Sequence, residues 1–317
     1  MNTRLWSGVL LCLLVVASAF AADDALPVPA DGAEVVFEAE SDATFFEISL
    51  GPIVRREKAI SMSTHKLADT RGYFGRVARR QYKITTTAST TEIHARYLEW
   101  FAANGYTVLL DALGDSPMAP GGTSWALRVY GSLPTPVAVE LSGTGDKSRR
   151  RYVVAERRDA TEHRVLTVLV NPRRITDIRV QVDIVDVDVA ATERAFPARE
   201  VLAKQLTADG RINLFGVRHV GKKTIPRDSI DRILTEIAAA LEADPQLALT
   251  IEGRATIADR PDSSAALGQA RASAVERLLV AEHGVPDARL QSRAAEISEP
   301  RDGEAASPDG IALVVTP

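Results

Sequence analysis

The only cysteine of the sequence, Cys12, lies within an apolar stretch that runs from Val9 to Ala19. The positive charge of Arg4 precedes this stretch, and Ala19-Phe20-Ala21 follows it, a pattern of small residues that is typical of signal-peptide cleavage. We therefore expect residues 1–21 to be a secretory signal peptide, removed together with the cysteine. The exported chain can then form neither a disulfide nor a thiolate metal site, so packed hydrophobic cores must stabilise its fold.

The exported chain of roughly 300 residues is longer than one hydrophobic core usually fills, which predicts two domains. Its composition, 45% hydrophobic and 25% charged, is that of an ordinary globular protein. The formal net charge of −4 becomes −5 when Arg4 is lost, and both signs are interspersed, so we do not expect nucleic acid as a partner. No segment after the leader approaches the length of about 20 apolar residues that a transmembrane helix needs.

The first predicted domain, residues 34–190, consists mostly of strands. Strand-like segments occur at residues 35–40, 44–50, 77–87, 106–110, 125–130, 137–141, 152–156, 165–170 and 178–189. One helix interrupts them at 91–103, where Ile93, Tyr97 and Phe101 recur at helical spacing. In the last strand both faces carry apolar residues, which predicts a β-bulge near Ile184 or Val185. An outer-membrane barrel is a weaker alternative, because aromatic residues make up only 5% of the chain and a helix interrupts the strands.

Parts of this first domain resemble an uncharacterised domain of exported proteobacterial proteins. The similarity lies in Leu50-Gly51-Pro52, in the strand from Arg76 to Ile84, and in Asn104-Gly105-Tyr106 after the helix. Since that family has no established activity, the resemblance implies no chemistry and leaves the envelope partner of this domain unknown.

Residues 191–210 are rich in Ala, Glu, Arg and Lys, and we expect them to form a linker with a short helix at 198–206. The second domain, residues 211–317, alternates strands and helices. Strands are predicted at 212–217, at 247–251, near 290 and at 311–315, and helices at 229–241 and 265–282. Gly284, followed by Pro286, ends the second helix. This order is βαβαββ.

The order, combined with Gly253, Leu267, Arg271-Ala272 and the run from Gly284 to Leu290, resembles the OmpA-like domain, a family that grips peptidoglycan without cutting it. The resemblance covers about one third of the chain. It implies an α+β protein in which a strand-rich N-terminal α+β domain precedes an OmpA-like βαβαββ sandwich domain.

The resemblance also implies a ligand site for the zwitterionic end of diaminopimelate in a peptidoglycan stem peptide. In the family a loop aspartate takes the ammonium and a helix arginine takes the carboxylate, and Gly253 and Arg271 stand at the family's positions. Thr256, however, stands where the family has the aspartate, and Asp259 or Asp262 would have to restore the negative charge.

Further departures from the family pattern are Ser264 for Asn, Gly268 for Ser, and Asp309-Gly310 for Asn-Arg-Arg. The alternative for Arg271 is a structural role, with its stem packed on the sheet.

Catalytic and metal-binding patterns do not emerge from the sequence. It has no nucleophile elbow, phosphate-binding glycine loop or dinucleotide fingerprint, and its five histidines are scattered. We therefore expect no enzyme, no cofactor and no metal. The sequence indicates a periplasmic protein, peripheral to the outer membrane, that docks weakly on peptidoglycan. The alternative is an OmpA-like fold kept as a protein-interaction scaffold without affinity for the cell wall.

Overall fold

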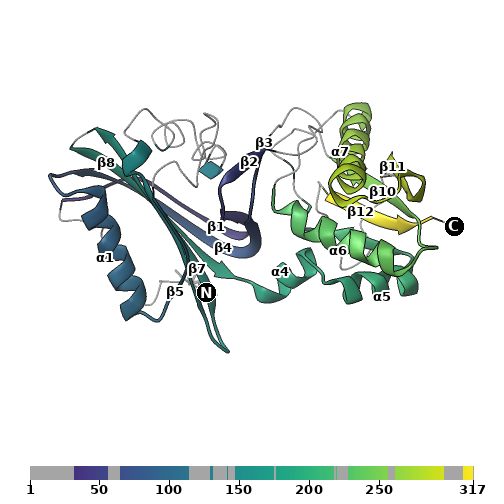
Figure 1. Ribbon diagram of the computed structural model, residues 1–317, viewed down its shortest axis with the longest axis horizontal. Helices are drawn as coiled ribbons and strands as arrows, with labels where there is room; N and C mark the ends of the chain where they lie inside the picture. Colours follow the sequence, from purple (N-terminus) through teal and green to yellow (C-terminus); the bar gives the residue numbers. More distant parts are fainter. Residues whose placement is uncertain are drawn as a thin grey trace, which may run out of the picture.

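The computed structural model describes residues 32–55, 65–113, 129–130, 141, 147–174, 176–217, 219, 228–255, 261–295 and 310–316 (Figure 1). The predicted signal peptide, residues 1–21, lies outside the described residues, as do most of the predicted strands at 125–130 and 137–141. Among the described helices, none has the length and apolar character that crossing a membrane requires.

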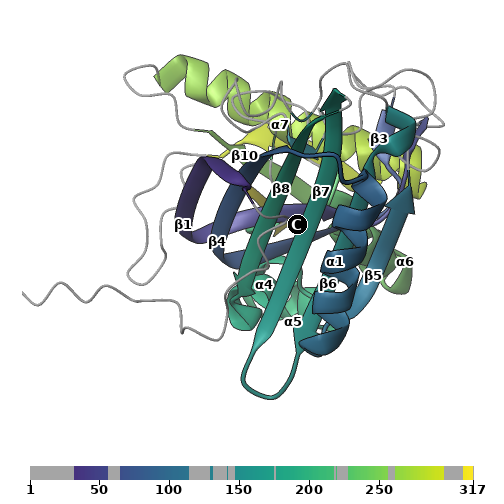
Figure 2. The same ribbon diagram turned by 90° about the vertical axis from the view of Figure 1, so that its left-hand side faces the viewer.

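The N-terminal half is built on a six-stranded antiparallel sheet with the strand order β1-β4-β8-β7-β6-β5 (Figure 2). Its strands are β1 (Glu34–Ser49), β4 (Thr70–Thr85), β5 (Thr107–Leu113), β6 (Arg151–Arg158), β7 (His163–Arg174) and β8 (Asp177–Val187). A small hairpin of β2 (Ile53–Arg55) and β3 (His65–Leu67) lies between β1 and β4 in the sequence, and a short 3-10 turn (Lys147–Arg149) precedes β6.

The helix α1 (Thr90–Ala103) confirms the predicted helix and lies across the β5–β6–β7 part of one sheet face (Figure 2). It begins with a capping box, in which Ser89 Oγ accepts from the Glu92 backbone N–H at 3.2 Å and Glu92 Oε2 accepts from the Ser89 N–H at 2.6 Å. Its residues Ile93, Tyr97 and Phe101 are fully buried against the sheet. This amphipathic face fixes the helix on one side of the sheet.

The predicted bulge in the last strand is wrong. β8 pairs with β4 residue by residue from Asp177 to Val187 without a shift in register. Both faces of this central strand are buried: Val182 packs on the α1 side, whereas Val185 belongs to a second core on the opposite face. The strand therefore carries apolar residues on both faces because a hydrophobic core covers each face. No β-bulge is needed to explain them.

The C-terminal half has the predicted βαβαββ order. Its elements are β9 (Arg211–Leu214), α6 (Ile230–Ala243), β10 (Leu249–Arg254), α7 (Pro261–His283), a 3-10 turn (Asp287–Arg289), β11 (Leu290–Ala294) and β12 (Gly310–Val315). The sheet order is β11-β10-β12-β9, with β10 and β11 parallel and the other pairs antiparallel. The expected apolar stripe of α6 is buried, and Gly284, at φ 69°, ends α7 as predicted.

Residues 191–210 do more than connect the two halves. They contribute to α4 (Val189–Ala195) and form α5 (Arg199–Asp209), and their residues Phe196, Leu202 and Leu206 are buried in the core of the C-terminal half. Phe45 and Phe74, from β1 and β4, pack against the same core. The hydrophobic core of the C-terminal half therefore extends to the end of the N-terminal sheet, where β1 and β4 curve toward it (Figure 1).

Polar contacts reinforce this junction at both helices of the C-terminal half. Lys66 Nζ lies 2.5 Å from Asp231 Oδ2 and 3.2 Å from Glu282 Oε2, which joins β3 to the start of α6 and the end of α7. At the same place Asp228 Oδ2 accepts from the Leu67 backbone N–H at 3.0 Å. The Ser229 backbone N–H, at the start of α6, donates to Glu47 Oε1 at 2.6 Å. The Glu47 side chain of the N-terminal half thus satisfies a backbone N–H group at the start of α6.

Candidate functional site

The strand β10 and the helix α7 meet at a contact between two glycines. A Cβ atom at Gly253, in β10, would lie 2.0 Å from the backbone oxygen of Gly268 in α7. A Cβ atom at Gly268 would likewise lie 2.4 Å from the Gly253 oxygen. Neither distance is sterically possible, so the helix backbone rests directly on the strand only because both residues lack a side chain.

Arg271 lies one turn after Gly268 on α7, on the buried side of the helix. The next residue, Ala272, has its backbone nitrogen 3.0 Å from the Cβ position of Gly253, so the backbone of Arg271 lies beside the contact between α7 and β10. The assignment of Gly253 and Arg271 to a ligand site stays a prediction. Only 2% of Arg271 is exposed. A guanidinium withdrawn this far from water needs charged or polar partners, because an uncompensated buried charge is strongly destabilising.

A comparison with protein families identifies the domain that forms the C-terminal half. Residues 219–309 match the OmpA family. The C-terminal half therefore carries an OmpA-like domain, which confirms the resemblance inferred from Gly253, Arg271 and the order of elements.

Similar solved structures include two proteins of this kind. The peptidoglycan-associated lipoprotein from Burkholderia pseudomallei is 26% identical, covering 32% of this chain and 88% of that one, with a TM-score of 0.27. The OmpA-like domain of FopA1 from Francisella tularensis subsp. tularensis SCHU S4 is 10% identical, covering 52% of this chain and 81% of that one, also with a TM-score of 0.27. The comparison with curated proteins found no match.

The remaining predicted ligand residues of the OmpA-like domain are only partly visible. Thr256 and Asp259 lie outside the described residues. Asp262 belongs to the first turn of α7, where its backbone alone is described. Ser264 is buried in the same helix, and Gly310 begins β12 opposite Arg254. The assignment of Thr256, Asp259 and Asp262 to a ligand site therefore stays a prediction.

Sequence reasoning missed Glu252, the residue before Gly253. Its side chain is 5% exposed and lies between two arginines: Arg293 Nη2 is 2.5 Å from Oε1, and Arg211 Nη1 is 2.6 Å from Oε2. Burial opposes ionisation of this carboxyl, but the hydrogen bonds from Arg293 and Arg211 outweigh it and lower the pKa of Glu252. The three side chains join β9, β10 and β11, so Glu252 orders the sheet that supports α7.

Proposed function

We propose that this protein is a non-catalytic component of the bacterial envelope whose OmpA-like domain docks non-covalently on peptidoglycan stem peptides. It would act in the periplasm, peripheral to the outer membrane. The observation that carries this proposal is the match of residues 219–309 to the OmpA family. The neighbouring positions of Gly253 and Arg271 support it, because they correspond to the family's ligand site.

The chemistry of the ligand predicts that docking is weak. The zwitterionic end of diaminopimelate carries one carboxylate and one ammonium, and Arg271 supplies a partner for the carboxylate alone. Thr256 can offer the ammonium one neutral hydrogen bond where the family offers a carboxylate. A hydrogen bond to a charged group contributes about 1.5–3 kcal/mol, so its loss weakens binding by roughly ten- to a hundred-fold.

Co-sedimentation of the mature chain with purified cell-wall sacculi at moderate salt tests this proposal. The full mature chain is needed because the core of the OmpA-like domain includes residues from β1, β4 and α5. We expect the native protein to sediment with sacculi and Arg271→Lys to bind about tenfold more weakly, since lysine keeps the charge but loses the bidentate fork. Arg277→Lys, at an exposed position of the same helix, is the matched control. Native protein that stays entirely in the supernatant would contradict wall docking.

A specific observation favours a second candidate function. Arg271 is only 2% exposed, and a guanidinium that water hardly reaches is typical of a structural side chain. In that case the OmpA-like fold serves as a protein-interaction scaffold without affinity for the cell wall. The variant Thr256→Asp separates the two functions: the scaffold predicts binding to sacculi that is absent in the native chain, whereas wall docking predicts that existing binding becomes ten- to a hundred-fold tighter, roughly.

A further inference from the structure

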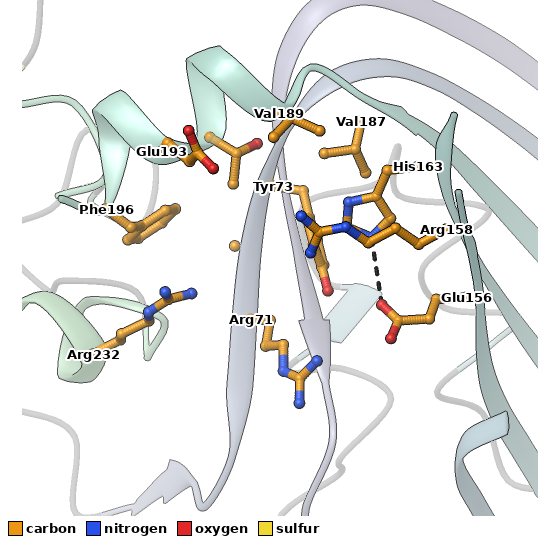
Figure 3. Close-up of a pocket in the computed structure, with 12 residues that line it drawn as sticks. Arg71, Tyr73, Glu156, Arg158, His163, Val187, Val189, Glu193, Phe196 and Arg232 are labelled. Atoms are coloured by element: carbon orange, nitrogen blue, oxygen red, sulfur yellow. Dashed lines mark hydrogen bonds and ion pairs between the residues drawn. The ribbon is translucent and has the colours of Figure 1, made fainter. Parts of the chain in front are cut away.

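A hollow at the junction of the two halves lies apart from Gly253 and Arg271. Its volume is about 260 Å³, and both halves and α4 contribute to its lining (Figure 3). The acidic and basic residues of the lining come from the sheet strands β4, β6 and β7 and from α4 and α6. They are Arg71, Glu156, Arg158, His163, Glu193 and Arg232.

Two guanidinium groups face each other across this hollow. Arg158, at the end of β6, and Arg232, in the first turn of α6, extend toward each other from opposite sides (Figure 3). Within the described part of the chain, no carboxylate lies within 4 Å of either guanidinium. Arg71, on β4, adds a third positive charge to the lining. The two guanidiniums repel each other because both are positively charged. An anion placed between Arg158 and Arg232 would be attracted by both and would relieve this repulsion.

The acidic side chains of the lining do not cancel these charges. Glu156 is engaged with His163, whose Nε2 lies 3.3 Å from Glu156 Oε2 (Figure 3). Burial lowers the pKa of His163, and the positive charges of Arg158 and Arg71 lower it further. These effects exceed the opposing influence of Glu156, so the imidazole is neutral at pH 7. Glu193, on α4, is the second carboxylate of the lining. Three arginines against two glutamates leave the hollow with one net positive charge.

The rest of the lining limits the size and character of a ligand. Val187, Val189 and Phe196 supply apolar walls. The Thr192 hydroxyl is committed to the backbone of β4, because its Oγ1 accepts from the Phe74 N–H at 2.9 Å. Pockets for drug-sized molecules measure roughly 300–1,000 Å³, so this hollow suits a smaller anion with at most a short organic part.

We propose that this hollow binds a small molecule through a phosphate group held between Arg158 and Arg232. A tetrahedral phosphate presents acceptor oxygens in opposite directions and can accept from two opposed guanidiniums at once. A single carboxylate can also bridge two guanidiniums, as Glu252 does between Arg211 and Arg293, but it carries one negative charge, whereas a phosphate group carries about 1.5 to 2 at pH 7. This proposal is independent of wall docking, since it involves neither Arg271 nor the loop that precedes α7.

Calorimetric titration of the mature full-length protein with inorganic phosphate, in a chloride buffer of low ionic strength, tests the phosphate site. We expect a Kd of about 1 mM or lower, measurable with phosphate up to about 10 mM. Arg158→Gln and Arg232→Gln should each weaken binding about tenfold, because each removes one charge-assisted contact. Both arginines are exposed, so the variants should keep the fold, and circular dichroism checks this. Arg277→Gln on α7 is the matched control and should bind as the native chain does.

Titration with acetate separates phosphate from carboxylate recognition and should give a Kd at least tenfold weaker. Acetate binding as tightly as phosphate would overturn the assignment of the anion. The site itself is overturned if the native chain does not bind phosphate, or if Arg158→Gln and Arg232→Gln bind it as well as Arg277→Gln does.

Discussion

At the residue scale, Asp183 is a carboxyl buried in the centre of the N-terminal sheet. Its side chain is fully shielded from water and accepts hydrogen bonds from Gln181 Nε2 at 2.7 Å and from Thr167 Oγ1 at 3.2 Å. Arg79 Nε is 4.0 Å away. Burial raises the pKa of Asp183 above its ordinary value, and this effect exceeds the opposing influence of Arg79, Gln181 and Thr167.

The raised pKa of Asp183 predicts a pH dependence of stability. The native state binds the proton more tightly than the unfolded state, so this carboxyl opposes folding increasingly as pH rises from about 4, the ordinary carboxyl pKa, through its raised pKa. Asp183→Asn keeps the acceptor for Gln181 and removes the charge. We expect it to increase the free energy of unfolding at pH 7 by on the order of 1 kcal/mol, and to have less effect at pH 4. Urea unfolding at both pH values measures this, and an equal loss of stability at both would contradict it.

At the scale of elements, the contact between β10 and α7 depends on Gly268. Serine, the usual residue of the family at this position, has a higher helix propensity than glycine, but its Cβ would lie 2.4 Å from the Gly253 oxygen. The helix would have to move away from the strand. We expect Gly268→Ser to lower the free energy of unfolding by about 2–3 kcal/mol. Chemical denaturation measures the loss, and Ala266→Ser, at an exposed position of α7, serves as the control with a loss of about 0.5 kcal/mol.

Periodic apolar residues made the elements of the OmpA-like domain predictable. Ile233, Leu234 and Ile237 mark the buried stripe of α6, and Gly284 marks the end of α7, because these signals are local in the sequence. The regular pairing of β8 was not predictable in the same way. Val182 and Val185 place apolar side chains on both faces of the strand, but the sequence does not reveal that a separate core covers each face.

The candidate site was predictable only in part, for a related reason. Gly253 and Arg271 follow from family spacing, but the burial of Arg271 and the steric contact between Gly253 and Gly268 depend on how α7 lies on β10. The hollow between Arg158 and Arg232 is a still longer-range feature, because β6 and α6 come from opposite halves of the molecule. No local pattern in the sequence reports such a juxtaposition.

At the scale of the whole molecule, the two halves share enough structure to unfold together. Phe45 and Phe74 pack on the core of the OmpA-like domain, and Asp228, which is 3% exposed, binds the Leu67 backbone N–H. Lys66 adds ion pairs to α6 and α7, but its side chain is 25% exposed, so each pair contributes less than a buried one. The buried contacts therefore dominate the coupling.

Two spectroscopic probes distinguish the halves during unfolding. Outside the predicted signal peptide the tryptophans are Trp100 and Trp125, both in the N-terminal half, so the fluorescence of a chain that begins at residue 22 reports on that half. Far-UV circular dichroism at helical wavelengths reports mainly on α4 to α7. We expect the two urea transitions of the native chain to coincide, as they must for a single cooperative unit. Transitions at clearly different urea concentrations would show that the junction does not couple the halves.

Asp228→Ala should separate these two transitions. The substitution leaves the buried Leu67 N–H without its acceptor, which costs about 1–3 kcal/mol, and the loss falls on the junction instead of on either core. Because each core keeps its own buried side chains, the half with the lower intrinsic stability is then free to unfold first. Asp287→Ala, at an exposed position just after α7, is the matched control and should leave the transitions coincident. If Asp228→Ala lowers stability but the two transitions still coincide, the shared aromatic packing of Phe45 and Phe74 is by itself sufficient to couple the halves.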